Sequence, residues 1–146
     1  MNNNFDLKNI KIFKNAKNIS EAIDNSGKHL LELGFIDKKY IEQMHKRHEK
    51  TSICIGNYLA IPHGLDDSKK LVKETGIVVH YYEQGFKVPD QEKEIRFVIG
   101  IASKDEQHLE ILSNIAVEFS DIEYVEQILN HKNIDKEYIK EVFSNE

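Results

Sequence analysis

The sequence predicts a single α/β domain over residues 1–146, with helices on both faces of a mixed β-sheet of about four to five strands. Two apolar segments in the middle of the chain carry this prediction. Residues 75–82 are rich in β-branched and aromatic side chains, and residues 95–102 are almost continuously apolar, as in a strand buried on both faces. Segments with helical periodicity precede and follow these strands, which indicates helices packed against a sheet.

The N-terminal third is predicted to hold one strand and two helices. The polar, Asn-rich residues 1–7 are expected to be flexible, and a short strand follows at residues 10–13. Ser20 is a good N-cap and Gly34 a good C-terminal stop, so a helix of about four turns is expected between them. Asp37 is expected to cap a second helix that runs towards His48.

The remaining elements follow from turn signals and helical stripes. Residues 53–55 and 58–61 predict two short strands around a turn at Gly56-Asn57, and residues 83–85 predict a turn after the first central strand. A helix is expected to begin at Asp105, because its apolar residues recur at helical spacing. Two further helices are expected at residues 122–129 and 136–143.

Composition excludes several classes of protein. The net charge of −5, from 25 acidic and 20 basic residues, argues against nucleic-acid binding, which needs a concentrated basic face. A single cysteine, Cys54, excludes an intrachain disulfide and favours a reducing cytoplasm, and its apolar neighbours indicate a buried, inert thiol. The N-terminus has no apolar signal region and no apolar run is long enough to span a membrane, so we expect a cytoplasmic protein with no membrane insertion.

One histidine, His63, stands out by its local sequence. The apolar run that begins at Leu59 ends in Pro62-His63-Gly64. Pro62 fixes its own φ, and Gly64 lets backbone or ligand approach the imidazole closely. This arrangement suits a nucleophile or a ligand, although a strand end followed by an ordinary turn would give the same local pattern.

Two more residues are candidates for the same site. His108 falls in the first turn of the helix that follows the second central strand, where a helix N-terminus attracts phosphate. Arg47, near the end of the second predicted helix, offers paired donors that match phosphate oxygens. His108 could equally be a surface residue of its helix, and a helical arginine standing alone is far more often a surface residue.

The other histidines give weaker signals. His45 and His48 lie three apart on a helix, a spacing that can bind metal, but the basic residues around them favour a solvated charged face. His80 lies in the strongest predicted strand and could face the core or a site, while His29 and His131 suggest no role.

Motifs of other enzyme classes are missing from the sequence. It contains no Gly-rich phosphate loop, no dinucleotide fingerprint, no Cys-x-x-Cys and no serine nucleophile elbow, which argues against an ATP-using kinase, a dehydrogenase and a serine hydrolase of familiar type. It also has no carboxylate pair for magnesium, and no cofactor and no metal are expected. The acidic pair Asp66-Asp67 is interpreted as a solvated turn that could help to dock a basic partner.

Five segments carry a resemblance to a known family: residues 40–47, 56–64, 75–79, 97–102 and 108–112. Taken together, they resemble the enzyme IIA domain of the sugar phosphotransferase system, mannitol/fructose type. Residues 82–88, together with residues 98–102, resemble its mannitol-specific branch most. The resemblance covers roughly residues 8–145 and implies that His63 accepts a phosphoryl group from phospho-HPr and passes it to a cysteine of the IIB component, which is membrane-associated through IIC. It also implies that Arg47 and His108 lie near this site and that the pathway serves uptake and phosphorylation of a sugar, mannitol.

The chemistry of a histidine agrees with this implication. An imidazole with an ordinary pKa of about 6.5 is largely neutral in the cytoplasm, so one ring nitrogen can attack phosphorus. Two alternatives stay open at this point. A stand-alone regulatory IIA-like module would act through its phosphorylation state, and a metal-dependent hydrolase would use His63, His108 and an acidic residue.

Overall fold

The computed structural model describes residues 5–104 and 107–144, and its centre is one five-stranded mixed sheet in the order β1-β4-β5-β3-β2. β1 pairs parallel with β4 and β3 pairs parallel with β5, whereas β4–β5 and β2–β3 are antiparallel. The predicted mixed sheet of an α/β domain is therefore confirmed. The strands are β1 Ile10–Phe13, β2 Cys54–Gly56, β3 Leu59–Ala60, β4 Gly76–Phe86 and β5 Ile95–Ala102.

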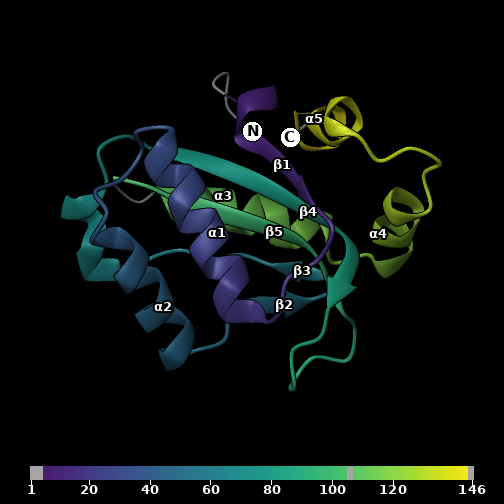
Figure 1. The fold of residues 1–146 in the computed structure, drawn as a ribbon, viewed down its shortest axis with the longest axis horizontal. Coiled ribbons are helices and arrows are strands. Elements are labelled where there is room, and N and C mark those ends of the chain that lie inside the picture. The colour runs from purple at the N-terminus through teal and green to yellow at the C-terminus, as the bar shows by residue number, and fades with distance from the viewer. Residues whose placement is uncertain (1–4, 105–106, 145–146) are drawn as a thin grey trace.

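Helices cover both faces of this sheet (Figure 1). α1 crosses in front of the strands with α2 beside it, and α3 lies behind them. The helices are α1 Ile19–Glu32, α2 Tyr40–Lys50, α3 Gln107–Glu118, α4 Ile122–Leu129 and α5 Lys136–Ser144, with two 3₁₀ helices, η1 Leu7–Asn9 and η2 Asp66–Leu71.

The two central strands are mostly apolar over residues 76–82 and 97–102 because each has a core on both sides there. Val78 and Val98 pack on the side of α1 and α2, whereas Val79 and Ile99 pack on the side of α3, α4 and α5. Successive side chains of a strand point to opposite faces, so a strand between two helical layers needs apolar residues at every position. This explains why residues 95–102 were recognisable as a strand.

The first two helices begin differently from the prediction. Asn18, not Ser20, is the N-cap of α1: its backbone is extended and its side chain accepts the N–H of Glu21 at 2.9 Å. Asparagine caps as well as serine does, and here it comes two residues earlier. Asp37 does not cap α2, because its side chain accepts the N–H of Lys39 in the turn before the helix.

The turn predicted at residues 83–85 is wrong, because β4 continues to Phe86. The pairing with β5 is irregular between Tyr81 and Phe86, and Gly85 has a φ of +71°. Arg96 of β5 donates from Nε to the carbonyl of Tyr82 and from Nη2 to that of Glu83, at 2.9 and 2.8 Å. The guanidinium thus satisfies carbonyls that the irregular pairing leaves out of the ladder.

The predicted hairpin before the site is confirmed, with its turn one residue later. Asn57 and Tyr58, rather than Gly56-Asn57, are the two central residues, with φ of 52° and 71°. Positive φ at both positions matches the twist of the flanking strands. The Asn57 amide donates to the carbonyl of Phe119 at 2.7 Å, which ties this hairpin to the end of α3.

The C-terminal helices agree with the prediction at α4 and α5, and α5 extends one residue further, to Ser144. The expected start of α3, Asp105, lies outside the described residues. The stretch expected to be flexible overlaps the described chain at residues 5–7, where Phe5 is buried and Leu7 begins η1. No described helix is both long and apolar enough to cross a membrane.

Candidate functional site

His63 lies on a loop that extends the pairing of β3 with β5. The loop leaves β3 after Ala60, and the N–H of Ile101 donates to the carbonyl of Pro62 at 2.9 Å. His63 forms a parallel bridge with Ile101 and is only 8% exposed. The histidine is therefore held against the end of a buried central strand, as a rigidly presented side chain requires.

The hydrogen bond at Nδ1 of His63 determines which ring nitrogen carries the proton when the imidazole is neutral. Nδ1 of His63 lies 2.8 Å from the carbonyl oxygen of Ile61. A carbonyl can only accept, so in the neutral ring Nδ1 carries the proton and the lone pair is on Nε2. Nε2 is thus the unprotonated nitrogen of the neutral ring.

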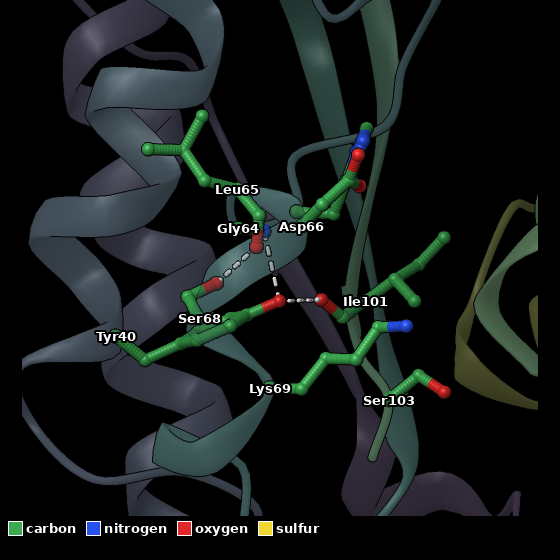
Figure 2. Close-up of a pocket in the computed structure, with 9 residues that line it drawn as sticks. Tyr40, Gly64, Leu65, Asp66, Ser68, Lys69, Ile101 and Ser103 are labelled. Carbon is green, nitrogen blue, oxygen red and sulfur yellow. Dashed lines mark hydrogen bonds between the residues drawn. The ribbon is translucent and has the colours of Figure 1, made fainter. Parts of the chain in front are cut away.

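A small pocket opens beside His63 (Figure 2). It measures about 20 Å³, roughly what one or two water molecules require, so it cannot enclose a sugar. Among its lining residues are one ammonium, one carboxylate and three hydroxyls, so it suits a small charged group at its mouth. The lining residues are Tyr40, His63, Gly64, Leu65, Asp66, Ser68, Lys69, Ile101 and Ser103.

Tyr40 closes one side of this pocket. Its hydroxyl donates to the carbonyl of Ile101 at 3.0 Å and accepts the N–H of Gly64 at 2.8 Å. Burial raises the pKa of Tyr40 to about 12, so the hydroxyl stays protonated and keeps both roles.

The surroundings of Gly64 leave no space for a side chain. A Cβ at this position would lie 2.5 Å from Cε1 of Tyr40 and 2.5 Å from Oγ of Ser68. The Ser68 hydroxyl in turn donates to the carbonyl of Leu65. Gly64 was predicted to let backbone or ligand come close to His63. In the structure, it is the side chains of Tyr40 and Ser68 that come close to Gly64.

Arg47 lies next to the pocket rather than in its lining. Its Nη1 donates to the carbonyl of Thr51 at 2.6 Å, and its side chain lines a neighbouring groove together with Lys50 and Asp67. Leu65 and Asp66 line both hollows, so the groove that Arg47 lines adjoins the pocket that His63 lines.

For His108, the structure describes the backbone, as the second residue of α3. Its side chain lies outside what is described. α3 follows the end of β5, whose Ile101 lines the pocket, and the prediction of a helix start near the site is consistent with that path.

Sequence reasoning missed Tyr40, Ser68, Lys69 and Ser103. Lys69 is half-buried on η2 and is the cation among the residues that line the His63 pocket. It follows Asp66 by three residues, which in a 3₁₀ helix brings both to the same side. This three-residue spacing was the one sequence signal that could have linked Lys69 to Asp66. It has that meaning only when residues 66–71 are known to form a 3₁₀ helix.

His45 and His48 of α2 make hydrogen bonds to neighbouring segments. Nε2 of His45 donates to the carboxylate of Asp24 at 2.8 Å, and Nδ1 of His48 accepts the N–H of Ile53 at 3.2 Å. Within the described residues, no group of three or more His, Cys, Asp or Glu side chains is placed to hold a metal ion. Cys54 is half-buried, and burial raises the pKa of its thiol, which makes it a poor nucleophile.

Comparisons with known proteins agree over nearly the whole chain. The family model described as "Phosphoenolpyruvate-dependent sugar phosphotransferase system, EIIA 2" matches residues 3–145. The mannitol-specific phosphotransferase enzyme IIA component of Halalkalibacterium halodurans is 41% identical over 121 residues, 83% of this chain and 82% of that protein. The component of the same name from Staphylococcus aureus is 37% identical over 139 residues, 95% of this chain and 94% of that protein.

A solved structure extends the similarity to the fold. Enzyme IIA in the complex of enzyme IIAMTL and phosphorylated enzyme IIBMTL from Escherichia coli has a TM-score of 0.84 and 26% identity, over 97% of this chain and 98% of that one. The similarity therefore includes the loop that carries His63 and the elements on each side of it.

Proposed function

Since this chain belongs to the EIIA 2 family of the phosphoenolpyruvate-dependent sugar phosphotransferase system, we propose that His63 is its phosphoryl-carrying residue and that the sugar served is mannitol. The observation that supports His63 most strongly is the bond from its Nδ1–H to the carbonyl of Ile61, which leaves Nε2 as the nucleophile. We propose mannitol as the sugar because the relatives above are mannitol-specific enzyme IIA components and the similar solved structure is a complex of enzyme IIAMTL with phosphorylated enzyme IIBMTL.

The transfer to this chain is a displacement at phosphorus. Nε2 of His63 attacks the phosphorus of phospho-HPr, the new N–P bond forms as the old one breaks, and the electron pair returns to the HPr imidazole. The ring of His63 then carries positive charge, and its Nδ1–H becomes a stronger donor. The Ile61 carbonyl, already 2.8 Å away, stabilises that charge without rearranging.

The second transfer reverses these roles. A cysteine thiolate of IIB attacks the same phosphorus, the N–P bond to His63 breaks, and the ring returns to its neutral form with the proton on Nδ1. Both steps need in-line placement and stabilisation of phosphoryl charge, and little covalent chemistry from the protein.

Cationic donors around the ring stabilise the phosphoryl oxygens. Lys69 lines the pocket that His63 lines, and Arg47 lines the adjoining groove. We assign both to the phosphoryl group, with Lys69 nearer to the ring. His108, at the start of α3, is proposed as a further donor.

The partners follow from this chemistry. Phospho-HPr is the donor, and the acceptor is IIB of a permease that is associated with the membrane through IIC. We propose that the chain acts in the cytoplasm as a single domain over residues 1–146, without nucleic acid and without inserting into the membrane itself.

Phosphoryl transfer from labelled phospho-HPr tests this function. The wild-type chain should become labelled and then transfer the label to a mannitol-specific IIB in preference to a fructose-specific one. His63→Ala should accept no label, whereas His131→Ala, which removes an exposed histidine elsewhere, should accept it at the normal rate. Labelling of His63→Ala at the wild-type rate would overturn the assignment.

A further inference from the structure

The hydroxyl of Tyr40 lies where three segments meet. Tyr40 belongs to α2, the carbonyl it donates to belongs to Ile101 at the end of β5, and the N–H it accepts belongs to Gly64 in the loop after β3. Figure 2 shows both bonds at one oxygen atom. Tyr40 is 4% exposed, so water cannot readily replace this hydroxyl.

These bonds hold the backbone on both sides of His63. On one side, Pro62 accepts the N–H of Ile101 directly, at 2.9 Å. On the other side, Gly64 is joined to the carbonyl of the same Ile101 through the Tyr40 hydroxyl. His63 is thus anchored to one residue of β5 at both flanks, and Tyr40 supplies one of the two anchors.

The same side chain fixes the helix that carries Arg47. Tyr40 is the first residue of α2 and Arg47 lies seven residues later, about two turns along, so both face the same side. A bond from Tyr40 to the sheet therefore helps to fix the rotation and axial position of α2, together with the buried Met44, and with them the position of Arg47.

We propose that Tyr40 is a positioning residue for phosphoryl transfer, which aligns the His63 ring with the helix that carries Arg47. The proposal rests on the function proposed above. Without the hydroxyl, a buried N–H at Gly64 and a buried carbonyl at Ile101 lose a partner, and the loop shifts to satisfy them. Small displacements of a reacting group are costly, so we expect transfer to slow by roughly tenfold to a hundredfold.

Single-turnover transfer from phospho-HPr to Tyr40→Phe tests the proposal. The expected result is a maximal rate at least about tenfold below that of the wild type. The HPr concentration for half-maximal rate should change by less than about twofold, because Tyr40 is buried and offers almost no surface to HPr. Tyr82→Phe is the matched control: Tyr82 is fully buried, its hydroxyl accepts from the Asn25 amide at 3.1 Å, and it lies outside the pocket.

The outcomes separate the two proposals. A wild-type rate in Tyr40→Phe, or an equal loss in Tyr40→Phe and Tyr82→Phe, overturns the role of Tyr40, whereas absence of labelling in the wild type overturns the phosphoryl-carrier function itself. If Tyr40→Phe does not fold, amide hydrogen exchange of the wild type decides. A protected Gly64 N–H supports the anchor, and exchange as fast as in an exposed loop contradicts it.

Discussion

Nε2 of His80 donates to Nδ1 of His29 across 2.8 Å in the core between α1 and the sheet. The direction of this bond follows from Nε2 of His29, which lies 2.8 Å from the carbonyl oxygen of Lys8. A carbonyl only accepts, so Nε2 of His29 carries the proton and Nδ1 of the neutral ring is the acceptor. Nδ1 of His80 is buried with no hydrogen-bond partner, so the pair is stable only while both rings are neutral.

This pair predicts a loss of stability in acid. Burial lowers the pKa of His29 and lowers that of His80 well below its ordinary value, and Lys11 lowers both further. The hydrogen bond to the Lys8 carbonyl and the Glu32 carboxylate raise the pKa of His29 in part, and Lys136 lowers it. The unfolded chain therefore binds more protons than the folded one below about pH 6.5. The stabilisation is complete above that pH and is lost as the pH falls towards the folded-state pKa values.

Urea denaturation at several pH values measures this effect. We expect the free energy of unfolding to fall by about 1 to 3 kcal/mol between pH 7 and pH 5. His80→Phe should flatten the dependence, since it removes the more deeply buried imidazole, whereas His131→Gln should leave it unchanged. An equally steep dependence in His80→Phe would contradict the assignment to this pair.

The same pair shows what the sequence could not provide. His29 and His80 are 51 residues apart, and each lies in a context that suggests no role or an ambiguous one. Their contact depends on how α1 packs on β4, which no local pattern encodes. The strands and helices themselves were predictable, because their apolar period reports directly which faces are buried.

The candidate site also contains residues that local sequence suggested and residues that only the fold brings together. His63 could be predicted as a candidate because Pro62 fixes the backbone before it and Gly64 carries no side chain after it, and both are its direct neighbours in the sequence. Tyr40 and Lys69 were missed because they reach the pocket from α2 and η2, 23 residues before and six residues after His63. Where elements were misplaced, as at residues 83–85, a distant side chain, that of Arg96, stabilises the alternative.

Gly64→Ala should damage both stability and transfer. Its Cβ would come within 2.5 Å of the Tyr40 ring and the Ser68 hydroxyl, so we expect about 1 to 3 kcal/mol of destabilisation and slower labelling by phospho-HPr. Gly34→Ala is the control, because Gly34 has a φ of +82° and open space around it. It should lose stability through backbone strain and keep the wild-type transfer rate. Equal transfer rates in the two variants would contradict this account of Gly64.

Lys69→Met should slow acceptance of the phosphoryl group by roughly tenfold or more, because it removes the cation that lines the His63 pocket. Lys70→Met makes the same change of charge at the next, exposed residue and should leave the rate unchanged. Rapid-quench labelling of both variants makes the comparison. If the two lose rate equally, the effect comes from overall charge and docking rather than from the pocket.

The central claim is that Nε2 of His63 receives the phosphoryl group while Nδ1 stays bonded to the Ile61 carbonyl. Nitrogen-15 and phosphorus-31 NMR of the phosphorylated protein tests it directly, since the coupling identifies which ring nitrogen bears phosphorus. We predict phosphorus on Nε2 of His63 and a proton on Nδ1. Phosphorus on Nδ1, or on any other residue, would contradict the account.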